Sequence, residues 1–323
     1  MKRVWKIIFL TLLIVAGVGV TSLVVGGLFG GIAQAFTLIR QEAGSRGACL
    51  EGWEEANLSG YHDEDEMWRE LERTMLDDGH PLIKERHYED QQVAAASEIT
   101  EIVVEAGRCS LYLQTTEQGS YGISADNIHV LQCYAQDGKL VVRANHNRSE
   151  HNHDGSLTLY LPASAQVREI DLQLGAGVLT GGSVRTEKLT MQTGMGEISL
   201  SGLTAEEVTL ETGLGWMEIS DSEVTDLVID TGVGGLRYQG RILGDVEAAC
   251  AMGSIEMDIA GDKDDFNYTT ECVAGSIILG EDGDMYCIGM HELDYGADKE
   301  MVLECAMGAI EIRFDESGGM EYE

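Results

Sequence analysis

The sequence predicts an all-β fold, a β-solenoid or single-stranded β-helix of about 19-residue coils, from two observations. First, glycines recur at a fixed period of 19 residues and then at intervals of 22 and 33, namely Gly177, Gly196, Gly215, Gly234, Gly253, Gly275 and Gly308. Second, apolar residues alternate with polar ones on both sides of these glycines. A short fixed period indicates stacked structural units. Strict alternation is typical of half-buried strands.

Each coil can be numbered from its glycine. The positions −7, −5, +2 and +4 are largely apolar, and we expect them to fill the core, whereas the acid-rich positions −4 and +3 should face water. The residues at +2 are Leu179, Ile198, Met217, Leu236, Ile255, Ile277 and Ile310. A glycine corner suits a sharp turn because glycine tolerates positive φ or close backbone approach. Each coil should therefore hold two short strands, about 4.8 Å from the next coil.

The N-terminal part, residues 1–40, is a basic tip followed by a long uncharged stretch. Residues 7–36 carry no charge, and about 20 apolar residues are enough to cross a bilayer as a helix. Lys2, Arg3 and Lys6 precede this stretch, which favours a single-pass protein with a cytoplasmic N-terminus and the bulk of the chain outside. A cleaved signal peptide is the alternative, since residues 33–35 have a small-x-small form, but the apolar run exceeds its usual length.

Residues 41–92 are acidic, and we expect a partly helical stalk there. Met67, Trp68, Leu71 and Met75 have helical spacing, and Asp63 is suited to cap the helix. Residues 93–323 then form the solenoid domain. The strands expected before Ile170 are less regular than the later coils, as is common for terminal units of a repeat.

The charge and motif content exclude several functions. The formal net charge is −35, which argues against nucleic-acid binding because phosphate contacts need clustered Lys and Arg. The sequence contains no GxSxG, HExxH or Walker motif, so we expect no enzymatic activity. The enzymatic alternative is a carbohydrate-active β-helix. Such a site needs matched carboxylates or a basic group near them, and aromatic platforms, whereas we expect few bases and few exposed aromatic residues apart from Trp216.

Two groups of residues have the composition of metal ligands. His146, His151, His153 and Asp154 lie in a nine-residue run that could hold zinc or nickel, although a polar loop between strands explains the same composition. The carboxylates of Glu211, Asp230 and the 262–265 loop could bind calcium, although a solvated acidic surface is the expectation we favour. We expect no metal and no cofactor.

Three cysteines share one position in their coils. Cys250, Cys272 and Cys305 lie at −3, where earlier coils have threonine. Cysteines on adjacent coils would be close enough for a redox pair. Alternatively, they form a ladder of small residues that packs at the corner, with cysteine as a small hydrophobe. We favour the ladder, because parallel side chains in register rarely have the torsion that a disulfide needs.

The step LYLP, which ends at Pro162, followed by coils of the form T-G-x-G-x-I-x-L, resembles the DUF4097 family of bacterial β-strand-repeat proteins, described as “putative adhesins”. The resemblance covers about Val93 to Arg313. It implies a bacterial, surface-exposed β-solenoid, often membrane-anchored and sometimes encoded with envelope-stress components. Together with the expected membrane helix, this favours a location at the bacterial plasma membrane. The resemblance brings no established catalytic residues. The chain departs from the simple pattern at the 14-residue excess between Gly275 and Gly308.

We therefore expect a non-enzymatic, membrane-anchored surface or envelope module that acts in adhesion or as a scaffold. One alternative is a regulatory envelope-stress component that acts through its membrane helix, and another is the carbohydrate-active enzyme. The expected partners are the membrane, through residues 7–36, and a surface protein or glycan, with self-association possible. Specific recognition is expected at residues 281–300 or in the irregular strands before Ile170.

Overall fold

The computed structural model describes residues 80, 83, 87–128, 130–145, 155–280, 284–286 and 288–315, which belong to the compact unit Leu82–Glu323 apart from residue 80. The regular elements described are strands and two short 3-10 turns, η1 (Ala96–Glu98) and η2 (Lys263–Asp265). The strands are β1 (His87–Ala95), β2 (Glu101–Thr116), β3 (Ser120–Asp126), β4 (Val130–Gln136), β5 (Lys139–Asn145), β6 (Ser156–Pro162), β7 (Val167–Gly182), β8 (Thr186–Thr193), β9 (Glu197–Ser201), β10 (Thr204–Thr212), β11 (Trp216–Thr231), β12 (Gly235–Ile242), β13 (Val246–Cys250), β14 (Ser254–Ala260), β15 (Phe266–Cys272), β16 (Ser276–Leu279), β17 (Asp284–Tyr286), β18 (Gly289–Leu293), β19 (Lys299–Cys305) and β20 (Ala309–Asp315).

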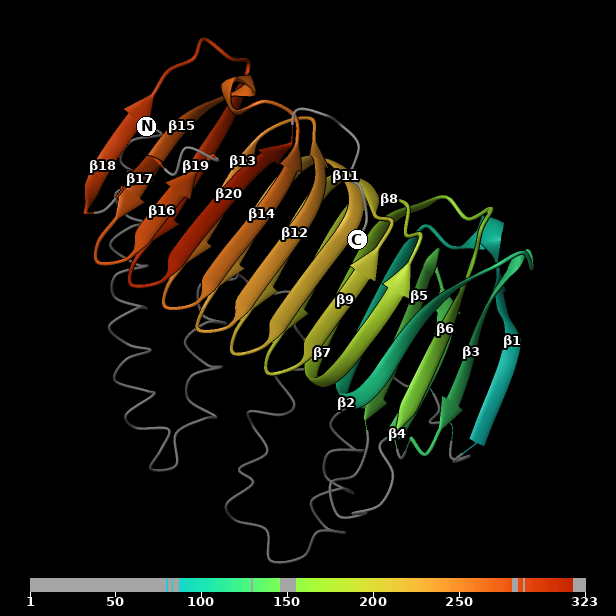
Figure 1. Cartoon of the computed structure of the whole chain (residues 1–323). Helices are drawn as coiled ribbons and strands as arrows, with labels where there is room; N and C mark the ends of the chain where they lie inside the picture. The colour runs from blue at the N-terminus through green and yellow to red at the C-terminus, as the bar shows by residue number, and fades with distance from the viewer. Residues whose placement is uncertain are drawn as a thin grey trace, which may run out of the picture. The chain divides into compact units, whose positions relative to one another are not determined.

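The strands form two faces that meet at the glycine corners (Figure 1). The first face has the order β4-β5-β2-β7-β8-β10-β11-β13-β19-β15-β18. The second face has the order β1-β3-β6-β2-β7-β9-β11-β12-β14-β20-β16-β17. The long strands β2, β7 and β11 contribute to both faces because each continues through a corner.

The 19-residue period of the sequence is the register of the parallel ladder. Leu189 pairs with Val208, Val208 with Leu227, and Leu227 with Val246. The side chains at −7, −5, +2 and +4 of the coils are buried between the two faces, as the alternation predicts. Their removal from water is the main force that holds one face against the other.

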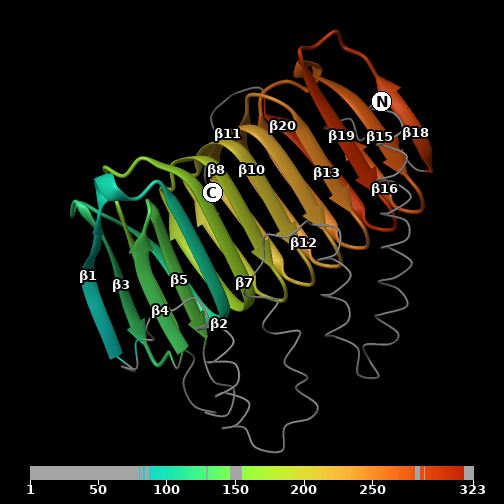
Figure 2. The ribbon, with the colours of Figure 1, turned by 180° about the vertical axis from the view of Figure 1, so that it is seen from behind.

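The coils do not stack in chain order at either end, which corrects our expectation. The last coil, β19 and β20, lies between the coils that precede it in sequence, since Met301 pairs with both Val246 and Tyr268. At the other end β2 is enclosed in the same way, because Ile102 pairs with both Leu140 and Ile170. Figure 2 shows these two ends from behind.

Antiparallel strands occupy the ends of the stack. The excess between Gly275 and Gly308 contains β17 and β18, which pair antiparallel with β16 and β15. At the opposite end β3 and β4 pair antiparallel with β6 and β5, and β1 pairs with β3. The extra residues therefore supply edge strands for the outermost coil. They also let the chain turn back, so that β19 lies between β13 and β15.

The helical parts of the predicted fold class are contradicted in the part of the chain that the structure describes. We expected a transmembrane helix over residues 7–36 and a helical stalk over 41–92, but no α-helix occurs among the described residues. No helix in the described part of the chain is both long and apolar enough to span a bilayer. His87–Ala95, at the end of the expected stalk, is strand β1 because its backbone pairs with β3. Residues 1–79 lie outside the described part.

The corner glycines are required by close backbone contact. A Cβ atom on Gly215, Gly234 or Gly253 would overlap the carbonyl oxygen of the equivalent glycine in the preceding coil. The ladder continues through the corner, where the amide of Trp216 donates to the Gly196 carbonyl at 3.1 Å. Among the seven corner glycines, Gly177 alone has a positive φ, so coil-to-coil distance explains most of the repeat.

A column of threonines lies inside the corner, one coil apart at position −3. The Oγ1 atom of Thr193 accepts a hydrogen bond from the Gly196 amide at 3.1 Å. The Oγ1 atoms of Thr212 and Thr231 are buried and have no hydrogen-bond partner. A buried hydroxyl without a partner lowers stability because it has lost its hydrogen bonds to water.

We predict that Gly234→Ala lowers the free energy of unfolding by about 2 kcal/mol or more, because the new methyl group forces adjacent coils apart. Urea titration of the full chain measures this change. The matched control is Gly119→Ala, whose added Cβ meets no atom within 4 Å. A change of similar size in both variants would contradict the explanation.

The threonine column gives a prediction with opposite signs at two equivalent positions. Thr231→Val should raise the free energy of unfolding by about 1 kcal/mol, since it removes an unpaired buried hydroxyl. Thr193→Val should lower the free energy of unfolding by about 1 kcal/mol, because the Gly196 amide loses its acceptor. Urea titrations of the two variants test the difference, and equal effects would refute it.

Candidate functional site

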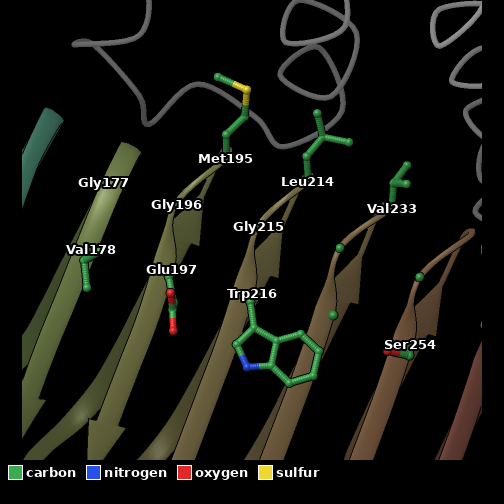
Figure 3. A pocket seen from close by; sticks show the side chains of 13 residues that line it. Gly177, Val178, Met195, Gly196, Glu197, Leu214, Gly215, Trp216, Val233 and Ser254 are labelled. Carbon is green, nitrogen blue, oxygen red and sulfur yellow. The ribbon is translucent and has the colours of Figure 1, made fainter.

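The candidate site is an apolar ridge along the glycine corner. We define the ridge as the residues that directly precede the corner glycine in five stacked coils, namely Met195, Leu214, Val233, Met252 and Met307. The amide of each ridge residue donates to a carbonyl of the neighbouring coil at 2.8–2.9 Å. These bonds stack the side chains one per coil. Figure 3 shows Met195, Leu214 and Val233 at successive corners, all pointing away from the strands.

The ridge exposes large apolar side chains to solvent. Leu214 is 52% exposed, and Met195 and Met307 are each 49% exposed, while Val233 and Met252 are half-buried. Isolated exposed apolar residues are common, but a contiguous row of them marks an interaction site. This site was not predicted from the sequence. The available signal was the recurrence of Met, Leu or Val between two small residues at five of the seven corners, with Ala176 and Ala274 at the other two.

A shallow groove of about 720 Å³ runs beside the ridge on the side of the second face. Its floor is formed by the corner glycines, which leave the backbone uncovered. Its opposite side is lined by Val178, Glu197 and Trp216, the residues that follow the glycine (Figure 3). The groove thus combines apolar walls with one carboxylate and one indole.

Trp216 extends along the groove from one coil to the next. A Cβ atom on Gly235, its register partner, would overlap the indole ring, so the ring lies against the bare backbone of that glycine. The side chain is 37% exposed. The expected exposure of Trp216 is confirmed, and the structure adds that the indole faces the groove beside the ridge.

Acidic residues flank the ridge on the first face. Glu211 and Asp230 are register partners on adjacent coils, and Gln192 donates from Nε2 to Glu211 Oε2 at 2.8 Å. Burial raises the pKa of Glu211, and the nearby Asp230 charge raises it further, against the lowering effect of the Gln192 bond.

The second face also carries acids beside the ridge. Glu218 is exposed and Glu256 half-buried, both at position +3 of their coils. Between Thr186 and Ala260 the chain has fourteen acidic and three basic residues. Acidic residues therefore outnumber basic ones on both sides of the ridge, with Arg237 between Glu218 and Glu256 on the second face.

The corner on the opposite edge of the faces differs in chemistry. There, the Ser201 hydroxyl donates to Asp221 at 3.0 Å, and a smaller hollow of about 380 Å³ is lined largely by polar residues, among them Glu223 and Arg241. Leu243, which is 52% exposed, also lies in this corner. It matches Leu214 in residue type and exposure, and it lies outside the ridge.

The three cysteines at −3 form one buried column, and their order along the stack is Cys250, Cys305, Cys272. Cys305 pairs with both Cys250 and Cys272, so the expected neighbours Cys250 and Cys272 are separated by a coil. All three are free thiols. Cys250 donates its S–H to Cys305, which raises the pKa of Cys250 and lowers that of Cys305. The thiols are 0–2% exposed, as expected for a packing ladder.

The candidate metal ligands have different outcomes: Glu211 and Asp230 are register partners on adjacent coils, whereas the histidine set is not described. His146, His151, His153 and Asp154 lie outside the described residues. In the 262–265 loop, Asp262 accepts from the Asp264 amide at 3.0 Å and caps η2. The described part of the chain contains no grouping of three His, Cys, Asp or Glu side chains suited to a metal ion.

We predict that Glu211→Gln stabilises the fold at neutral pH. A carboxyl whose folded pKa is raised costs stability once it ionises, so the penalty is absent at low pH and grows as pH rises through the folded pKa. The variant should match the parent below about pH 4 and exceed it at pH 7. Unfolding curves at both pH values measure the effect, and a pH-independent difference would contradict it. Asp230→Asn should act in the same direction.

Comparisons with known proteins place the chain in a family. The family model described as Toastrack DUF4097 matches residues 99–285, more than half of the chain. A search of curated proteins gives no match.

Two solved structures are distantly similar to this chain. One, from Clostridium sporogenes, is described as a “putative cell adhesion protein”; it has 13% identity and a TM-score of 0.37, with 71% of this chain and 100% of that chain covered. The other, from Bacteroides fragilis, is described as a “putative adhesin”; it has 14% identity and a TM-score of 0.40, with 72% and 97% covered. The family match confirms the resemblance expected from the sequence, and the chain belongs to the Toastrack DUF4097 family.

Proposed function

We propose that this protein is a non-enzymatic binding module of the cell surface or envelope, which acts in adhesion or as a scaffold. The observation that carries the proposal is the apolar ridge, a row of exposed Met and Leu side chains held in register on an acidic domain. Membership of the Toastrack DUF4097 family supports it. Attachment to a membrane through residues 7–36 and the extracytoplasmic location stay predictions from the sequence.

The geometry supports binding better than catalysis. The ridge is fixed by backbone hydrogen bonds and backed by a packed core, so little ordering is needed when a partner binds. The groove beside it is shallow and has a glycine floor, which suits contact with a macromolecule. The partner, a surface protein or a glycan, would cover apolar side chains that now contact water.

We predict that the full chain binds at least one partner in an array of glycans and surface proteins, and that this binding depends on the ridge. Leu214→Ser should weaken binding about tenfold, because it removes a side chain whose burial is worth about 1.5 kcal/mol. Surface plasmon resonance with the immobilised full chain measures the affinities. The matched control is Leu243→Ser, which changes an equally exposed leucine outside the ridge.

Two outcomes would overturn the proposal. One is chemical turnover of an array component by the purified chain. The other is equal loss of binding in the two leucine variants, since that would separate binding from the ridge. Thermal unfolding of both variants shows that the fold is retained.

A further inference from the structure

The charges around the ridge indicate the chemistry of its partner. On the first face Glu211 and Asp230 form one acidic row, and on the second face Glu218 and Glu256 belong to another, in which Arg237 lies between them. Between Thr186 and Ala260 the sequence has fourteen acidic residues and only three basic ones. One of the basic residues, Arg237, is paired with Asp258 at 3.3 Å. A complementary surface is therefore an apolar strip between two cationic rows.

The spacing of the ridge favours a helical partner. Stacked coils place ridge side chains about 4.8 Å apart, so the five residues span about 19 Å. An α-helix repeats its apolar face every turn of about 5.4 Å, and about 13 residues cover that length. A strand repeats one face about every 6.8 Å, which matches the ridge less well.

The side chains of the ridge suit a helix in the same way. Three of the five are methionines, which are unbranched and adapt to the shape of an apolar partner. Met-rich grooves that receive amphipathic helices use this property. The exposed side of Trp216 extends the apolar surface toward the second face.

We infer that the apolar ridge binds a cationic amphipathic helix of a partner protein. The apolar side of the helix packs on Met195, Leu214 and the ridge residues that follow, and its Lys and Arg side chains reach the two acidic rows. A second copy of this chain fits poorly because it has the same net charge of −35. Residues 7–36 of the chain itself carry no charge, so they would bring no positive charge to the acidic rows.

The inference rests on the proposed function and adds the partner class. The test uses three labelled peptides of about 14 residues and the full chain. The first has Leu and Lys arranged with helical periodicity, the second has the same composition arranged with a period of two, and the third has helical periodicity with Glu in place of Lys. Fluorescence anisotropy gives the affinities. The helical Leu/Lys peptide should bind at least tenfold more tightly than the other two.

Variants locate the binding. Leu214→Ser should weaken the helical Leu/Lys peptide about tenfold, whereas Leu243→Ser should leave it unchanged. The double variant Glu218→Gln with Glu256→Gln should weaken it about threefold, whereas Glu206→Gln, an exposed acid away from the ridge, should not. Raised salt should weaken binding, since exposed charge pairs are screened.

Three outcomes would overturn the inference. They are equal affinity for the helical and period-two Leu/Lys peptides, equal loss in the two leucine variants, and concentration-dependent dimerisation through the ridge in light scattering. If these peptides fail while the array yields a glycan or a neutral protein whose binding depends on Leu214, the proposed function stands and the helical partner is refuted.

Discussion

Each coil passes over the glycine of the preceding coil, and the backbones of the two coils are in contact there. A side chain at Gly234 would overlap the carbonyl oxygen of Gly215, and the same holds along the corner. This close approach allows the parallel ladder to continue through the turn, so the two faces stay in register. The core residues, the threonine and cysteine column and the ridge all take their positions from it.

A parallel stack of coils leaves open edges at both ends, and unpaired edge strands invite unwanted association. This chain has the same solution at each end. At each end one coil lies between two others, and antiparallel strands such as β3 and β18 pair with the outermost coil. Because β19 lies between β13 and β15, Cys305 separates Cys250 from Cys272.

The surface chemistry separates the two corners. The glycine corner exposes Met195, Leu214 and Met307, whereas the opposite corner is mainly polar, with the Ser201 to Asp221 hydrogen bond as an example. Both corners lie on a strongly acidic domain. An apolar row that persists over five stacked coils of such a domain is difficult to explain by folding, since its side chains contribute little to the core. Binding explains it better.

The sequence alone determined the period, the buried positions of each coil and the glycine corner, because these depend on contacts that repeat every 19 residues. It also determined the family, through the coil pattern from LYLP onward. It did not predict that β19 lies between β13 and β15, since pairing at unequal intervals leaves no periodic signal. Residues 87–92, the first part of β1, were assigned to the stalk because their pairing with β3 is a tertiary effect. The ridge was decided by the tertiary structure too, because only stacking in register turns single apolar residues between small residues into one continuous surface.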